Sequence, residues 1–180
     1  MRWDDLFDDL DARLAHAGRL DREAEVADRR ARDLASVDLL GRLLATAGEL
    51  SVQLPDGGWV GGRVRAAGPG WVLLAAGAPV PRQVLVPTAA VCALRGLSRA
   101  STAPGAVAQR RTLVLALRAL AAAGEDVLVR TPAADVRGRL VRVGADHVDV
   151  SAPGTAAPGS GGAGVLTVPF ASLLSVTELV

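Results

Sequence analysis

Arginine is the residue type in this sequence with the clearest capacity for binding chemistry. All 20 basic residues are arginines, and five of them fall in two predicted strands: Arg63, Arg65, Arg137, Arg139 and Arg142. Side chains alternate between the two faces of a strand, so Arg63 and Arg65 share one face and Arg137 and Arg139 share another, with Arg142 nearby. If the two structural units that contain these strands pack side by side, the arginines merge into one basic stripe able to contact phosphates.

Other interpretations of the arginines remain open. Aromatic residues, on which single-stranded bases stack, make up only 3% of the chain. Ordinary solvated strand faces, with arginines paired to nearby carboxylates, account for the same pattern. The acidic N-terminal segment is an equally suitable partner for the stripe. Under that hypothesis a group of its carboxylates lies against the arginines and blocks them: Asp4, Asp5, Asp8 and Asp9.

No group of residues has the spacing of a catalytic or metal site. Asp146, His147 and Asp149 offer oxygen and nitrogen ligands, but only His147 and Asp149 share a strand face, and two side chains make a weak site. His16 has no recognisable partner, whereas general acid–base catalysis requires one within hydrogen-bond reach. We therefore predict that the protein is not an enzyme and has no catalytic residues, no cofactor and no metal.

Two further features invite a chemical interpretation and lack the context for it. Residues 159–164, Gly-Ser-Gly-Gly-Ala-Gly, match the spelling of a dinucleotide-binding loop, but such a loop must open a helix and a predicted strand follows this one. We interpret it as a flexible connection. Cys92 is the only cysteine, and its apolar strand predicts that it is buried and inert. A single cysteine allows no disulfide within the chain, which fits a reducing compartment.

Composition predicts a globular protein without a membrane span. Hydrophobic residues make up 50% of the chain, which is enough for a core of Val, Leu and Ala. The longest apolar run, 112–124, is interrupted by Arg118 and is too short to cross a bilayer. The acidic N-terminus is unlike the basic start of a secretory signal. We expect a cytoplasmic protein with no membrane partner.

The charge is divided unevenly along the chain. Residues 1–36 contain ten acidic and seven basic groups, whereas residues 37–180 contain nine and thirteen. Within residues 1–36, apolar side chains recur at steps of three and four from Trp3 to Ala27, which predicts an amphipathic helical segment. Its apolar stripe either packs on the rest of the chain or forms a dimerising helical hairpin or coiled coil.

An internal repeat organises the remaining residues. Residues 48–74 match residues 124–150, and Gly62-Arg63-Val64 falls on Gly138-Arg139-Leu140. Six extra residues then bring Val86-Pro87 onto Val168-Pro169. The first strand fits better after a slip of one residue, which places Leu50 on Val127. A repeat of this kind predicts two copies of one structural unit.

Each copy predicts a short helix followed by five strands. We expect the first unit at 37–97, a linker at 98–110 and the second unit at 111–180. In the first unit, Trp71 and Leu73 make one strand apolar on both faces, which predicts that both faces are covered. His147 and Asp149 occupy the matching positions of the second unit, so that face is predicted to be exposed.

Several residues carry a resemblance to the Sm-like family, and to its bacterial Hfq branch in particular. They are the helix before the first strand, the hairpin Leu54-Pro55-Asp56-Gly57, the spacing from Gly138 through Gly144 to His147, and the closing segment 165–176. The resemblance implies two tandem five-stranded small barrels of the Sm-like or SH3-like kind, each preceded by a short helix, in a mainly β chain with helices. An N-terminal helix followed by two such units also resembles an actinobacterial protein family to which no activity is attached.

The resemblance does not extend to the residues with which that family contacts RNA. The aspartate after the second strand is replaced by Gly68 and Gly144, and a base-binding asparagine by Val72 and Val148. The Tyr-Lys-His set of the bacterial branch falls on 86–88 and 168–170, where the sequence is Val-Pro-Thr and Val-Pro-Phe. The resemblance therefore implies the fold without the family's uracil-binding chemistry.

These observations lead to two functional expectations. The first is a non-enzymatic binding or scaffold protein that self-associates as a dimer or ring, or binds a protein partner, through the N-terminal helix and edge strands with unpaired backbone groups. The alternative is binding of RNA or another nucleic acid through the arginine-bearing faces of the units.

Overall fold

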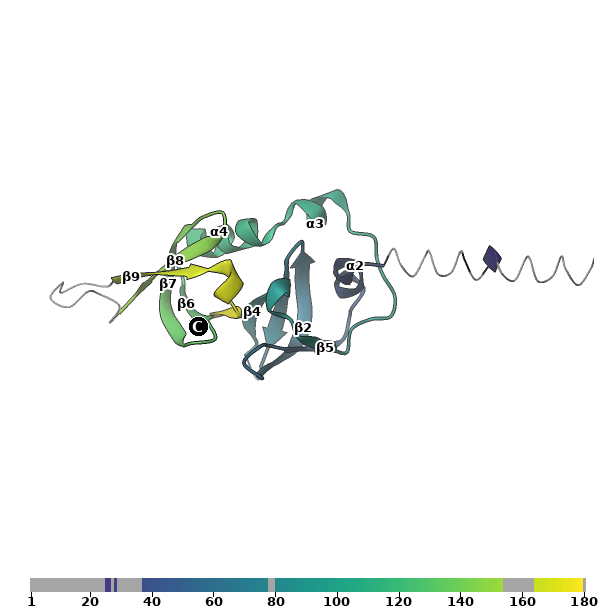
Figure 1. Cartoon of the computed structure of the whole chain (residues 1–180), viewed down its shortest axis with the longest axis horizontal. Helices are drawn as coiled ribbons and strands as arrows, with labels where there is room; N and C mark the ends of the chain where they lie inside the picture. Colours follow the sequence, from purple (N-terminus) through teal and green to yellow (C-terminus); the bar gives the residue numbers. More distant parts are fainter. Residues whose placement is uncertain (1–24, 27, 29–36, 78–79, 154–163, 180) are drawn as a thin grey trace, which may run out of the picture. The chain divides into compact units, whose positions relative to one another are not determined.

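The computed structural model describes residues 25–26, 28, 37–77, 80–153 and 164–179 (Figure 1). Almost all of the predicted helical segment 1–36 lies outside these residues, together with His16, the four aspartates of the blocking hypothesis, and the glycine-rich loop up to residue 163. Leu39–Val180 form one compact unit. No helix in the described part of the chain is long and apolar enough to cross a membrane.

The unit is built on a single antiparallel sheet of ten strands, in the order β5-β1-β2-β3-β4-β10-β6-β7-β8-β9. The first repeat supplies β1 (Glu49–Gln53), β2 (Trp59–Gly68), β3 (Trp71–Ala76), β4 (Arg82–Pro87) and β5 (Ala93–Arg95). The second supplies β6 (Asp126–Arg130), β7 (Asp135–Val143), β8 (His147–Ala152), β9 (Gly164–Pro169) and β10 (Ser175–Glu178). The helices are α2 (Leu39–Leu44), α3 (Ala106–Arg110) and α4 (Leu113–Ala123), with 3-10 turns η1 (Thr88–Ala90) and η2 (Phe170–Ser172).

The prediction of a mainly β protein with helices is confirmed, but the ten strands form one open sheet and not the two separate small barrels that were expected. In the first repeat, β5 pairs with β1 and leaves β4 without a partner from its own repeat. The strand β10 of the second repeat fills that place, with Val176 opposite Leu85 and Thr177 opposite Val84. The two sets of five strands therefore join into one open sheet. The segment predicted to be a linker, 98–110, also contains helix α3.

The pairing of the strands confirms the predicted internal repeat. Leu50 lies opposite Gly62, and Val127 lies opposite Gly138, so the one-residue slip that places Leu50 on Val127 is confirmed. Each long strand also has an irregularity at the same place, between Val64 and Ala66 in β2 and between Leu140 and Arg142 in β7. Bulges of this kind bend a strand and increase its twist.

The two short helices end differently, although the sequence aligns Gly48 with Gly124. Helix α4 ends at Gly124, whose φ of 69° is left-handed and suits a residue without a Cβ. Gly48 does not cap the first helix, because α2 already ends at Leu44. Thr46 closes that helix instead: its hydroxyl donates to the Arg42 carbonyl at 2.8 Å and accepts the Ser98 amide at 3.0 Å.

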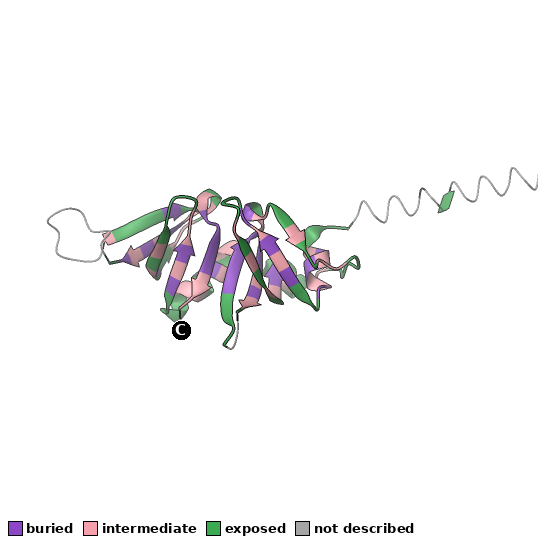
Figure 2. Ribbon diagram, turned by 90° about the horizontal axis from the view of Figure 1, so that it is seen from below, coloured by how far each residue is buried: buried purple, intermediate pink, exposed green. Residues whose placement is uncertain are grey.

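Buried aliphatic side chains form two cores, one for each repeat, and the repeats exchange residues at the joint. Figure 2 shows the buried and exposed bands that alternate along the strands. Leu174 of the second repeat is buried in the first core, whereas Trp71 and Leu85 of the first repeat are buried in the second. The prediction that Trp71 is covered is thus confirmed, and the cover is the second repeat.

Cys92 corrects another sequence-based expectation. It was predicted to be buried, but its side chain is exposed. Its amide donates to the Gln53 carbonyl at 2.9 Å, just as the Leu174 amide donates to the Arg130 carbonyl at 2.9 Å. Cys92 and Leu174 therefore occupy equivalent positions, and only Leu174 has a neighbouring repeat to cover it.

Candidate functional site

The five predicted arginines are all exposed on their strands, but they do not merge into one stripe. Arg63 and Arg65 belong to β2, and Arg137, Arg139 and Arg142 belong to β7. Four strands lie between β2 and β7 in the sheet, so the two arginine-bearing strands are not neighbours although the repeats lie side by side. The structure separates the arginines of the first repeat from those of the second.

A groove is lined by two of the five predicted arginines, Arg137 and Arg139, and by Arg82, which was not predicted from the sequence. Its volume is 660 Å³. It is lined by Arg82, Asp126, Arg137, Gly138, Arg139, Ser151, Pro153 and Leu179. Arg82 comes from the first repeat and the other lining residues come from the second. Arg63, Arg65 and Arg142 do not line it.

The groove exists because β4 and β10 pair across the joint between the repeats. The register places Arg82 at the start of β4, next to the end of β10. The amide of Leu179, just beyond β10, donates to the Asp126 carbonyl at 3.0 Å, and Asp126 lies opposite Arg139. Arg82 therefore lies at the same end of the sheet as Asp126 and Arg139, on a strand of the other repeat. Its sequence context, a lone arginine before an apolar strand, gave no signal of this arrangement.

One ion pair orients a guanidinium within the groove. The Nε atom of Arg139 donates to Oδ1 of Asp126 at 2.7 Å, and this bond raises the pKa of Arg139 above its usual value. The two side chains are 62% and 59% exposed, so the pair contributes little to folding stability. Because only Nε is engaged, the two terminal nitrogens of Arg139 are left for another acceptor.

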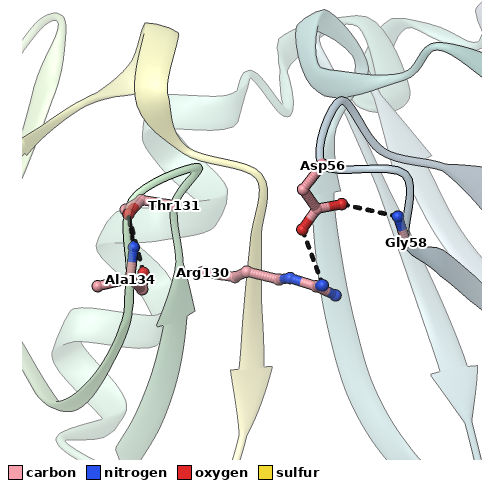
Figure 3. Close-up of polar contacts among 5 residues, drawn as sticks. All are labelled: Asp56, Gly58, Arg130, Thr131 and Ala134. Atoms are coloured by element: carbon pink, nitrogen blue, oxygen red, sulfur yellow. Dashed lines mark hydrogen bonds and ion pairs between the residues drawn. The ribbon is translucent and has the colours of Figure 1, made fainter.

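The opposite end of β6 carries a second ion pair, and this one joins the two repeats. Nη2 of Arg130 lies 2.7 Å from Oδ2 of Asp56, in the hairpin that joins β1 and β2. Oδ1 of the same aspartate accepts the Gly58 amide at 2.9 Å. Figure 3 shows the Arg130 side chain reaching from β6 toward this hairpin, with the Thr131–Ala134 turn beside it. We call the boundary between the repeats, where β4 pairs with β10, the seam. The Arg130–Asp56 contact ties the two repeats together at the end of the seam that lies away from the groove.

A smaller hollow of 220 Å³ has a different lining, in which apolar side chains predominate. They come from β3, β4, α4, β6 and β10: Leu73, Leu85, Leu120, Ala123, Val127 and Val176. The polar residues around it are Gln83, Glu125 and Glu178. The backbone amide of Gln83 donates to a carboxylate oxygen of Glu178 at 3.4 Å. This lining suits an apolar group and offers no positive charge to an anion.

The polar side chains of Asp146, His147 and Asp149 form hydrogen bonds with each other or with the neighbouring strand. Nδ1 of His147 is 2.8 Å from Oδ1 of Asp146, and this hydrogen bond lowers the pKa of Asp146. Asp149 accepts a hydrogen bond from Thr167 on the neighbouring strand at 2.6 Å. Among the described residues, no set of three His, Cys, Asp or Glu side chains is arranged to hold a metal ion.

No protein-family model matches the sequence, and no curated protein matches it at a significant level.

Proposed function

We propose that the protein is a non-enzymatic scaffold that assembles end to end through its edge strands, on a pair of Sm-like units. The observation that carries this proposal is the pairing of β4 with β10. It joins the fourth strand of one repeat to the fifth strand of the other. The two outer edges of the sheet are also a fourth and a fifth strand: β9 is the fourth strand of the second repeat, and β5 is the fifth strand of the first. A second copy of the chain can supply β5 to β9 in the same way.

The repeat fixes the register that such a joint would have. Leu94 corresponds to Val176, because their cross-strand partners Val52 and Val129 are themselves equivalent. Thr167 corresponds to Leu85, because each precedes the valine that lies opposite Val148 or Val72. Val176 lies opposite Leu85 within the chain. The joint between copies therefore pairs Leu94 of one copy with Thr167 of the other.

The side chains at the free edges make this joint weaker than the internal one. Leu174, Leu85 and Trp71 are almost fully buried at the internal joint, and burial of one large apolar side chain contributes about 1.5–3 kcal/mol. Their counterparts at the free edges are Cys92, Thr167 and His147, which are smaller or polar. Assembly is accordingly expected to be reversible and dependent on protein concentration, with backbone hydrogen bonds supplying much of the contact.

Cross-linking tests the register directly. In a Cys92→Ser background, Leu94→Cys with Thr167→Cys places two thiols directly opposite each other across the proposed joint, close enough for a disulfide. These positions lie on opposite outer edges of one chain's sheet, so a disulfide has to join two copies. The matched control, Leu94→Cys with Leu166→Cys, is out of register by one residue, which turns the side chains to opposite faces.

The expected result is covalent dimers and longer species from the first pair and none from the control. Light scattering after gel filtration of the unmodified chain should show a mass that rises with concentration. A strict monomer at high concentration, or equal cross-linking of both cysteine pairs, rules out the proposed joint.

Nucleic-acid binding is the second candidate function, and the groove of the seam is the observation that favours it. Three arginines surround that groove, whereas Arg63, Arg65 and Arg142 lie outside it. Any such binding is therefore assigned to the joint between the repeats and not to the arginine faces of separate units.

A further inference from the structure

We infer that the groove lined by Arg82, Arg137 and Arg139 is a binding site for phosphate groups. The inference rests on the second candidate function and names the site at which it acts. It is independent of the edge strands, since none of the groove's lining residues belongs to β5 or β9. Loss of assembly and loss of phosphate binding are therefore separable outcomes.

Charge is the first argument for a phosphate ligand. The lining contains three arginines and one aspartate, so the groove carries a positive charge that the nearly neutral chain as a whole does not. Among the described residues, Arg82 and Arg137 take part in no ion pair. Guanidinium groups present several N–H donors in a planar fork that matches the oxygens of a phosphate.

The Asp126–Arg139 pair gives the groove an oriented donor. Asp126 holds Nε of Arg139 at 2.7 Å, which leaves the outer edge of the guanidinium, with its terminal nitrogens, for two parallel hydrogen bonds to one phosphate. Asp126 is therefore a positioning residue. Arg82 and Arg137 then supply further charge from β4 and β7, on either side of the seam.

The rest of the lining argues for a phosphate and against a bound base. Pockets for drug-sized ligands occupy about 300–1,000 Å³ and are lined mostly by apolar and aromatic side chains. This groove has a suitable volume of 660 Å³, but its lining contains no aromatic residue and only Pro153 and Leu179 as apolar side chains. Ser151 adds a hydroxyl. Such a site holds phosphates without stacking bases, and it is therefore expected to be indifferent to base sequence.

Comparison of the two repeats shows that the cluster of three arginines occurs only at the seam. The equivalent positions elsewhere in the described sheet provide a control for the binding experiment. The counterpart of Arg139 in the first repeat is Arg63, which lies opposite Glu49. The counterparts of Arg137 and Arg82 are Gly61 and Gly164, by their places beside equivalent strand residues. The three positions equivalent to Arg82, Arg137 and Arg139 thus hold a single arginine, Arg63.

Binding of a short single-stranded RNA to the full chain, measured by fluorescence anisotropy, tests the site. Arg82→Ala and Arg137→Ala are each expected to weaken binding about fivefold at low salt, which corresponds to about 1 kcal/mol for a solvent-exposed charge pair. The plot of log affinity against log salt should have a slope of about −2 for three contacts, and each substitution should reduce it by about 0.7. Arg63→Ala with Arg65→Ala removes two exposed charges outside the groove and should change affinity by less than either single substitution.

Inorganic pyrophosphate serves as the second probe and separates the two sources of phosphate. Competition by pyrophosphate with the same dependence on Arg82 and Arg137, in the absence of RNA binding, assigns the site to a small phosphorylated molecule. The inference is overturned if neither probe binds at low salt. It is also overturned if the Arg63/Arg65 control weakens binding as much as the groove variants, because the effect is then one of overall charge.

Discussion

Arg130 and Asp56 form an ion pair between the two repeats, with Nη2 and Oδ2 2.7 Å apart. The side chains are 34% and 20% exposed, which places the pair between fully solvated and buried. A double-mutant cycle of Arg130→Ala and Asp56→Ala is expected to give a coupling energy of about 0.5–1 kcal/mol in urea unfolding, decreasing with added salt. Asp56→Ala alone should cost more than Arg130→Ala, because Asp56 also accepts the Gly58 amide.

The Asp126–Arg139 pair is the matched control for this cycle. It has the same 2.7 Å separation, but its side chains are 62% and 59% exposed. Its coupling energy should be close to zero, because solvent screens the charges and the side chains lose entropy on pairing. Equal coupling in the two cycles would show that burial at the seam does not strengthen the Arg130–Asp56 contact.

Local features of the fold were predictable from the sequence because alternation and turn residues report them directly. The repeat alignment correctly made Leu50 and Val127 equivalent positions, because each lies opposite the matching glycine of the next strand. The apolar faces of Trp71 and Leu73 also signalled that something covers them. What covers them was not encoded in any neighbouring residues.

Contacts between distant strands account for what the sequence could not supply. The pairing of β4 with β10 joins residues about ninety positions apart, and no local pattern shows whether such edge strands pair within one chain or between two chains. Arg82 enters the groove only through that pairing. Cys92 was expected to be buried because its strand is apolar, but burial at this position depends on a neighbouring repeat, which only Leu174 has.

Close backbone contact explains why each long strand carries a glycine opposite its first strand. A Cβ on Gly62 would collide with the Ala75 carbonyl oxygen, and a Cβ on Gly138 would collide with the Ser151 carbonyl oxygen. Gly62→Ala is therefore expected to destabilise the protein by about 1–3 kcal/mol or more, since the obstructing atoms are backbone atoms that cannot rotate away. Chemical denaturation followed by circular dichroism measures the change.

The neighbouring Gly61 provides the control for that substitution. The nearest atom to a Cβ at Gly61 is Oγ of Ser51, at an ordinary 3.6 Å. Gly61→Ala should change the free energy of unfolding by no more than about 0.5 kcal/mol, as expected for an exposed position. Equal losses at the two positions would contradict the steric explanation and point to a general intolerance of side chains in this strand.

Trp71 connects the stability of the two repeats, because it belongs to the first and is buried in the core of the second. It is 6% exposed, and its indole Nε1 donates to the Arg111 carbonyl at 2.6 Å. Trp71→Ala is expected to cost about 3–5 kcal/mol through the cavity it leaves. Trp71→Phe should cost about 1–3 kcal/mol, because the carbonyl of Arg111 loses its donor.

The shape of the unfolding curve then distinguishes a shared core from two independent ones. With Trp71 and Leu85 buried in the second core and Leu174 in the first, the described unit should unfold in one transition, and Trp71→Ala should shift that whole transition. His147→Ala, at the equivalent but half-exposed position, should have little effect. Two separate transitions in the unmodified chain, or a Trp71→Ala effect confined to one of them, would mean that the exchange of side chains across the seam does not couple the repeats.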